Sequence, residues 1–362
     1  MNRLTRRAEE ALLGAMLFRP EALPSMRWVP PKAFSSPDLG ALWSTLHGID
    51  FRRVARNDIP TAVTAAVAQI EDQGLRHCLS PTRIAQLASA CPDPRTAPLY
   101  GGMTLEGAIR RSVEHAGEEL KETAQRATID QATQALDQAD RAHNRLAALD
   151  SAWKHAPETV RSLLDTPAEE PVQLAPRSER ARICLQAEAE TVASLLSYPE
   201  QLPEVTGRLQ AADFSDAQMA TIYESMETLH DRHAPIDPVT VAWEAARRPG
   251  AQPSEQLMNE LTHAGMGGTA SASAEHVLRT AALDRLSAAG HHIRDLARHP
   301  ALAPTALINR ADHAMHPATA DRERIRLAER EPEPARADAE PAPAGPTDRQ
   351  LPSPGHEMEI DL

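Results

Sequence analysis

The sequence predicts an all-α fold made of two tandem helical domains. Only 3% of the 362 residues are aromatic, whereas Ala, Leu, Arg and Glu are abundant, and this composition favours helices over sheets. Apolar residues recur at spacings of three and four, as they do along one face of an amphipathic helix. Residues 10–49 also recur about 180 positions later, which indicates a duplicated domain.

The duplication rests on a proline-containing step followed by a spaced set of apolar residues. Leu17–Pro24 reads LFRPEALP, and Leu196–Pro203, 179 positions later, reads LSYPEQLP. A Phe follows each step, and the two Phe residues are 180 positions apart, so a one-residue insertion aligns the copies. Five apolar residues with the same spacing follow each Phe: Leu39, Leu42, Trp43, Leu46 and Ile49 in the first copy, and Met219, Ile222, Tyr223, Met226 and Leu229 in the second.

In the first copy, start and stop signals divide the chain into short helices. Thr5 can cap the first helix and Pro20 ends it, while Pro37 supplies a start signal for the third. The proline- and glycine-rich stretch Cys91–Gly102 predicts a loop. Leu105 to about Trp153 contains no proline and predicts a helical hairpin that folds near Thr128–Asp130. The expected short helices are Thr5–Phe18, Glu21–Met26, Leu39–Ile49, Thr61–Ile70 and Pro81–Ala90.

The second copy repeats this order. Asp237 before Pro238 is a favoured helix start, and Gly265–Gly268 predicts a loop. From about Pro317 the composition changes to Pro, Ala, Glu and Arg, which predicts a disordered tail. The expected helices are Leu185–Ser197, Glu200–Leu209, Asp216–His230, Pro235–Ala246, Ala274–Ala297 and Pro304–Met315, the last two forming a second hairpin.

These signals define a domain organisation for the whole chain. We expect a first helical domain, its hairpin, a linker, a second helical domain, its hairpin and a tail. Their respective ranges are 1–111, 112–155, 156–181, 182–286, 287–316 and 317–362.

Composition also excludes several classes of function. The formal net charge of −13 argues against general binding to nucleic acid, which usually needs a basic face. Three widely spaced cysteines match neither a disulfide framework nor a metal knuckle, and suggest a reducing compartment. No stretch approaches the 18–20 apolar residues that cross a membrane. We therefore expect a cytoplasmic protein without membrane contact.

No catalytic motif is apparent in the sequence. The chain has only three lysines, and none of them follows a glycine-rich loop as a P-loop requires, so we expect no ATPase, cofactor or metal site. His291 and His292 are adjacent, so a regular helix would point them in different directions. The acidic pairs, Glu9 with Glu10 and Glu188 with Glu190, are expected on solvated helix faces. An enzyme whose site escapes such motifs stays open as an alternative.

A few residues are candidates for contact with a partner. Arg110, Arg111 and Arg285 lie near the end of each copy and could bind an acidic surface or a phosphate, although an exposed helix face is the favoured interpretation. Trp43 and Tyr223 occupy equivalent positions and could stack on nucleobases, but their place in an apolar stripe favours a role in the core. The segment 357–362, EMEIDL, has the acidic and apolar composition of short docking peptides.

The repeat unit resembles the N-terminal domain of the bacterial replicative helicase DnaB. In the first copy the resemblance rests on Ala8–Glu9, the LGAML core and the PEAL step of Pro20–Leu23, followed by Phe34. In the second copy it rests on Ala187–Glu188, Val192–Leu196, Pro199–Leu202 and Phe214. The second copy also carries PIDPVTV at 235–241, similar to the family's P-V-D-x-V-T-V segment.

The resemblance covers residues 6–150 and 183–315 and lacks the ATPase domain that follows in the helicase. In that family the domain forms a dimerising hairpin, builds the collar of the ring and receives primase. It therefore implies a non-catalytic replication protein that docks on replicative helicase or primase. It also implies pairing of the two copies within the chain, or a homodimer. A plasmid or mobile-element replication protein that binds DNA directly is the alternative.

Overall fold

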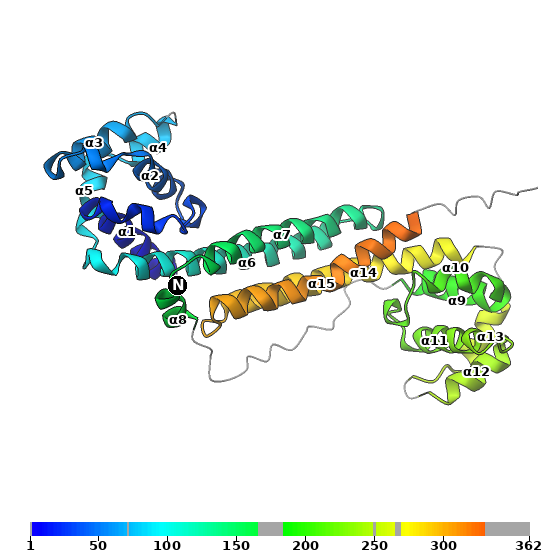
Figure 1. Ribbon diagram of the computed structural model, residues 1–362. Helices are drawn as coiled ribbons and strands as arrows, with labels where there is room; N and C mark the ends of the chain where they lie inside the picture. The colour runs from blue at the N-terminus through cyan, green and yellow to red at the C-terminus, as the bar shows by residue number, and fades with distance from the viewer. Residues whose placement is uncertain (1, 71, 166–183, 249–250, 265–268, 330–362) are drawn as a thin grey trace, which may run out of the picture. The chain divides into compact units, whose positions relative to one another are not determined.

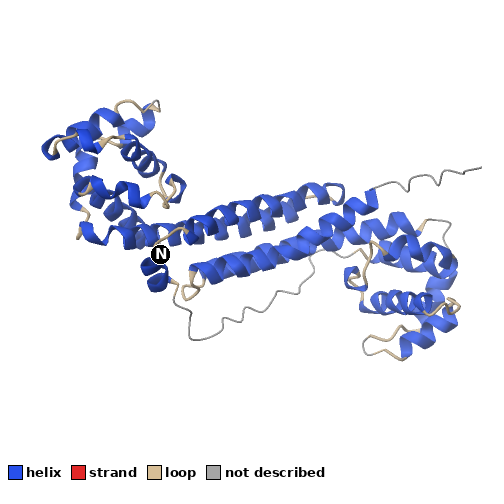
Figure 2. Cartoon of the chain, viewed as in Figure 1, coloured by secondary structure: helices blue, strands red, loops and turns tan. Residues whose placement is uncertain are grey.

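The computed structural model describes residues 2–70, 72–165, 184–248, 251–264 and 269–329. Within these ranges every regular element is a helix, as the all-α prediction requires (Figure 2). Residues Met1–Ala328 form one compact unit. We call residues 2–165 the N-terminal half and residues 184–329 the C-terminal half.

The N-terminal half begins with a cluster of short helices (Figure 1). The first helix starts before its predicted cap: Thr5 lies inside it, buried against Gly107, because residues Asn2–Leu4 already continue the helix. The helices are α1 (Asn2–Phe18), η1 (Pro20–Met26), η2 (Pro31–Ala33), α2 (Pro37–Gly48), η3 (Phe51–Arg53), η4 (Arg56–Asp58), α3 (Ile59–Val67), α4 (Gln73–Cys78), α5 (Pro81–Ser89) and η5 (Pro94–Thr96).

A long hairpin follows, with its turn at the predicted place. Helices α6 (Ala97–Arg126) and α7 (Ala132–Lys154) pack against each other, and η6 (Ile129–Gln131) lies between them. Thr128 and Gln131 form a capping box that starts the second arm.

The predicted loop Cys91–Gly102 is wrong over its second part, because α6 already begins at Ala97. Gly101 and Gly102 serve close packing rather than a turn. A Cβ on Gly101 would lie 2.6 Å from Met26 Cε, and one on Gly102 would overlap Val160. Long-range contacts therefore keep this glycine pair helical against its local preference.

Val160 belongs to a helix in the region predicted to be a linker. Helix α8 (Glu158–Leu164) packs on α6 through this buried residue, so the start of the predicted 156–181 linker is structured. The rest of that linker, residues 166–181, lies outside the described residues, as does the predicted loop Gly265–Gly268.

The C-terminal half also begins with short helices and ends with two long helices. Its first helix has the bounds that the sequence predicts, and the capped helix after Asp237 forms as expected. The helices are α9 (Leu185–Ser197), η7 (Pro199–Gln201), α10 (Leu202–Thr206), η8 (Ala211–Asp213), α11 (Ala217–Asp231), α12 (Pro238–Ala246), α13 (Glu255–His263), α14 (Ala270–Arg298) and α15 (Pro304–Glu329).

Helix α15 continues through the point where the sequence predicts disorder. Pro317 lies inside the helix, and beyond it Ala318, Asp321 and Ile325 are buried. Asp321 accepts a hydrogen bond from Arg285 on α14 (Nε to Oδ2, 2.6 Å), so packing and an ion pair hold this part of the helix in place. The predicted tail is therefore wrong for residues 317–329, and its remainder lies outside the described residues.

The two hairpins pair with each other within the chain. Helix α6 packs along α14, and the two backbones approach most closely at Gly117 and Gly290. A Cβ on Gly117 would lie 2.7 Å from the Gly290 carbonyl oxygen, and a Cβ on Gly290 would lie 2.7 Å from the Gly117 carbonyl oxygen. The crossing is therefore reciprocal, as in a two-fold symmetric dimer.

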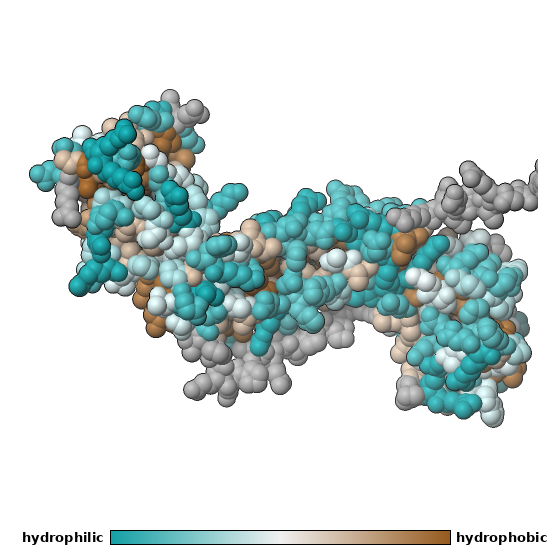
Figure 3. Space-filling model, viewed as in Figure 1, coloured by the Kyte–Doolittle hydropathy of each residue, from teal (hydrophilic) through white to brown (hydrophobic). Residues whose placement is uncertain are grey.

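Charged side chains reinforce this pairing. Arg298 on α14 donates to Glu114 on α6 at 2.9 Å, and Arg322 on α15 pairs with Asp140 on α7. Figure 3 shows that hydrophilic residues cover much of the visible face of these hairpins.

Candidate interaction surface

Each half contains a buried glutamate that binds the start of a helix. Glu9 and Glu188 are 0% exposed, so their predicted place on solvated helix faces is wrong. Glu9 accepts hydrogen bonds from the Ser35 amide (3.0 Å) and hydroxyl (2.6 Å), and Glu188 accepts them from the amides of Ser215 (2.8 Å) and Asp216 (3.0 Å). These donors offset the cost of burying a carboxylate, which periodicity alone does not reveal.

The aromatic residues of the repeat are core anchors in both halves. Trp43 Nε1 donates to the Val29 carbonyl at 2.9 Å, and the Tyr223 hydroxyl donates to the Leu209 carbonyl at 3.3 Å. Both rings are buried, and each lies beside the Phe of its own half. The core interpretation is confirmed, and a buried ring of this kind has no face open for a nucleobase.

Arg110 and Arg111, two of the predicted partner-binding residues, bind atoms of the chain itself. Arg110 is buried, and its guanidinium donates to the carbonyls of His299 (3.0 Å) and Pro300 (3.2 Å) after α14. Arg111 donates to the Ala33 carbonyl at 2.6 Å, and burial lowers the pKa of its guanidinium. The first arginine therefore joins the two halves, and the second holds α6 against its own domain.

Arg285 is the third predicted residue, and it belongs to an ionic cluster. It donates to Asp321 at 2.6 Å and to Asp213 at 2.8 Å, and Arg324 also binds both carboxylates. This cluster ties α15 to α14 and to the η8 turn. Each of the three arginines thus has an intramolecular role, and a contact with a partner stays an untested prediction.

The clearest exposed apolar surface lies on α12. Val239 is 78% exposed and Trp243 is 71% exposed, and their spacing of four places them on one face of the helix. Val241 and Ala245 on the opposite face are buried in the core. We call Val239 and Trp243 the α12 patch. Exposed tryptophan is typical of surfaces that bind a partner.

The corresponding helix of the N-terminal half lacks this patch. In α12 the two residues of the patch lie one and five positions after Pro238. The residues one and five positions after Pro60 in α3 are Thr61 and Ala65, which are small. Val63 and Val67 match the buried pair of α12. Residues 239, 241 and 243 are all apolar, but they cannot all lie on the face of one helix that packs against the core of the domain. This alternation is the signal in the sequence from which the α12 patch could have been predicted.

Two grooves open on the N-terminal half. One, of about 590 Å³, lies beside the end of α2 and is lined by Leu46, His47 and Phe51 among others. The other, of about 880 Å³, is lined by residues of α1 and α6 that include Leu4 and Met103. Both have the volume of a ligand- or peptide-binding site.

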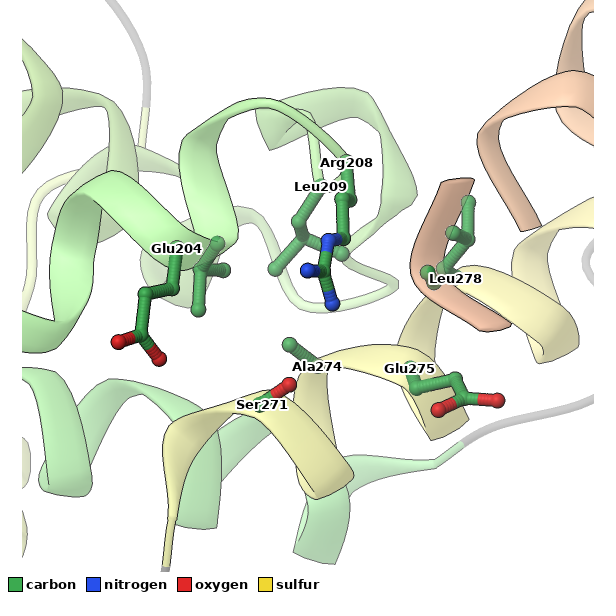
Figure 4. Close-up of a pocket in the computed structure, with 9 residues that line it drawn as sticks. Glu204, Arg208, Leu209, Ser271, Ala274, Glu275 and Leu278 are labelled. Carbon is green, nitrogen blue, oxygen red and sulfur yellow. The ribbon is translucent and has the colours of Figure 1, made fainter. Parts of the chain in front are cut away.

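The C-terminal half has a much smaller pocket. Figure 4 shows Glu204 and Arg208 across from Ser271, Ala274 and Leu278 on α14. Its volume is about 10 Å³, roughly what one water molecule needs, so it cannot hold a cofactor.

In residues 2–70, 72–165, 184–248, 251–264 and 269–329, no three His, Cys, Asp or Glu side chains are grouped to hold a metal ion. Over the same ranges, no helix combines the length and apolar character needed to cross a membrane.

Part of the C-terminal half matches the model of a known protein family. Residues 182–279 match the family model of the DnaB-like helicase N terminal domain. The matched region runs from before α9 into α14 and includes Glu188, Tyr223 and the α12 patch. Neither the curated proteins nor the solved structures gave a match. Residues 182–279 of the C-terminal half are therefore similar to the DnaB-like helicase N-terminal domain.

Proposed function

We propose that the protein is a non-catalytic, replication-associated interaction protein that docks on the replicative helicase or on primase. The observation that carries this proposal is the DnaB-like helicase N-terminal domain at residues 182–279. In a helicase this domain belongs to the part that assembles and recruits rather than to the motor. A role as a collar-like docking module follows.

The N-terminal half is proposed to be a second domain of the same kind. Support comes from hydrogen bonds at equivalent positions. Glu9 binds Ser35 as Glu188 binds Ser215, and Trp43 donates to a carbonyl 14 residues before it, as Tyr223 does. The reciprocal contact of Gly117 with Gly290 supports a dimer-like pair of domains built into one chain.

The α12 patch is the proposed docking face. It lies in the matched domain, it is the most exposed pair of large apolar side chains on one described helix, and the N-terminal half has no counterpart. A tryptophan in such a position commonly contributes about 2–4 kcal/mol to a protein interface.

Binding to purified helicase and primase from the same host tests this function. The full chain is expected to retain one of them on an affinity resin, and Trp243→Ser is expected to weaken that binding about 30-fold or more. Phe18→Ser, at a residue 54% exposed in the N-terminal half, is the matched control and should bind normally.

The possible outcomes distinguish the proposed docking function from the proposed docking face, the α12 patch. Failure to retain either helicase or primase would contradict the proposed function. Equal retention of the wild type and Trp243→Ser would contradict only the α12 patch. ATP hydrolysis by the purified chain would contradict the non-catalytic assignment.

A further inference from the structure

The groove at the end of α2 has an apolar floor and a basic rim. Its floor includes Leu23, Leu46 and Phe51, and Arg27 and Arg52 stand exposed at its edge. We call it the His47 groove. Its volume of about 590 Å³ is enough for two or three apolar side chains of a peptide.

His47 adds an unsatisfied polar atom to the wall of this groove. Its ring packs edge-on against Trp43, with centroids 4.8 Å apart, and its Nε2 atom is buried without a hydrogen-bond partner. Burial, aided by the positive charge of Arg27, lowers the pKa of His47. Buried polar atoms are usually paired in folded proteins, so this nitrogen is an exception beside the groove.

The acidic residues of the groove are already neutralised. Glu21 pairs with Arg19 at 3.3 Å, and Asp50 pairs with Arg53 at 3.1 Å. Neither Arg27 nor Arg52 forms an ion pair with any described residue. The rim therefore keeps positive charge for an incoming carboxylate.

The histidine of the groove is specific to the N-terminal half. The residue equivalent to His47, 180 positions later, is Glu227, which interacts with Tyr223. Burial raises the pKa of the Glu227 carboxyl. An acidic ligand that suits the N-terminal half would therefore meet a carboxyl group at this position in the C-terminal half.

The chain carries a segment with the complementary chemistry. In residues 357–362 the acidic Glu357, Glu359 and Asp361 alternate with the apolar Met358, Ile360 and Leu362. If extended, this segment would place its apolar side chains on one face and its carboxylates on the other. Residues 330–356, which precede it, could span up to roughly 90 Å.

We propose that the His47 groove binds the chain's own segment Glu357–Leu362. The apolar side chains occupy the floor, and the carboxylates face Arg27 and Arg52. This inference is independent of the helicase or primase contact, because it concerns a different surface in the other half of the chain. It gives the N-terminal half a peptide-binding role that the C-terminal half lacks.

A labelled peptide tests the groove on the full chain. The protein carries Met358→Ser, Ile360→Ser and Leu362→Ser, so that its own segment no longer competes, and the probe is a fluorescent peptide of residues 352–362. We expect saturable binding that Arg27→Glu with Arg52→Glu weakens about tenfold or more, since each reversal replaces attraction by repulsion. Arg126→Glu, at an arginine 78% exposed on α6, is the matched control.

The occupant is tested separately from the groove. Because an intact segment is tethered at high effective concentration, the wild-type chain should bind the probe more weakly than the triple-Ser chain. Equal binding by the two would overturn the assignment of Glu357–Leu362 as the occupant. Absence of probe binding, or binding that ignores Arg27→Glu with Arg52→Glu, would overturn the groove. Displacement of the probe by a short single-stranded oligonucleotide, but not by unlabelled peptide, would also overturn it.

Discussion

At the residue scale, two buried glutamates make equivalent hydrogen bonds in the two halves. The Glu9 carboxylate lies at the start of α2, and the Glu188 carboxylate lies at the start of α11. Each accepts hydrogen bonds from the backbone amide and the hydroxyl of a serine. A buried charge is tolerated only when such donors surround it. The position is therefore structural in both halves.

Removing one of these carboxylates should destabilise the fold. Glu188→Ala leaves the amides of Ser215 and Asp216 buried without their acceptor, at a cost of about 2–4 kcal/mol. The midpoint of urea unfolding should fall accordingly. Glu190→Ala, on the same helix at a partly exposed site, should change stability by less than about 0.5 kcal/mol. Equal effects of the two changes would contradict this account.

A second prediction concerns the pH dependence of stability at His47. Its pKa in the folded chain is lowered, first by burial and then by Arg27, so the folded state binds fewer protons there than the unfolded state. The contribution of neutral His47 to the free energy of unfolding is therefore complete above the unfolded pKa of about 6.5. It is lost as the pH falls through the lower pKa of the folded state.

The substitution His47→Phe isolates that contribution and keeps a ring against Trp43. We expect the loss of unfolding free energy between about pH 8 and pH 5 to be smaller in the variant than in the wild type. Burial also lowers the pKa of His292. Because His292 is present in both proteins, its effect on the pH dependence of stability cancels when the variant is compared with the wild type. A loss of the same size in both proteins would contradict the assignment.

At the element scale, the crossing of α6 and α14 depends on two glycines. Each backbone occupies the space that a side chain on the other helix would need. Gly290→Ala would place its Cβ 2.6 Å from the Lys121 amide nitrogen, which forces the helices apart. We expect a loss of about 1–3 kcal/mol, measured by thermal or urea unfolding.

Gly48 supplies the matched control for this change. It ends α2, and a Cβ there would have no neighbour within 4 Å. Gly48→Ala should be neutral or stabilise the protein by up to about 1 kcal/mol, because alanine loses less backbone entropy in a helix. If Gly290→Ala were as harmless as Gly48→Ala, the close crossing would be refuted.

At the scale of the whole molecule, internal pairing predicts a monomer. The surfaces that would join two separate subunits through their hairpins are covered by α6 and α14 of the same chain. Light scattering should therefore give a mass near 39.4 kDa at micromolar concentration. A stable hexamer would contradict this prediction, whereas Gly290→Ala should increase any tendency to dimerise.

Much of the secondary structure could be predicted from local signals. Proline steps, caps and helical periodicity placed α9, α12 and the hairpin turn after α6 close to their observed positions. The same signals failed at Gly101–Gly102 and at Pro317, where long-range packing overrides a local preference for a break. They also missed α4 and α8, whose short patterns are weak.

The all-α class and the likeness of residues 182–279 to a helicase N-terminal domain follow from the sequence alone, because periodicity, prolines and motif spacing are local properties. Which side chains are covered became clear from the packing of the helices. It buried Glu9 and Glu188, gave Arg110, Arg111 and Arg285 intramolecular partners, and left Trp243 exposed. Burial depends on what packs against a helix from elsewhere in the chain, and a helix's own pattern does not contain that information.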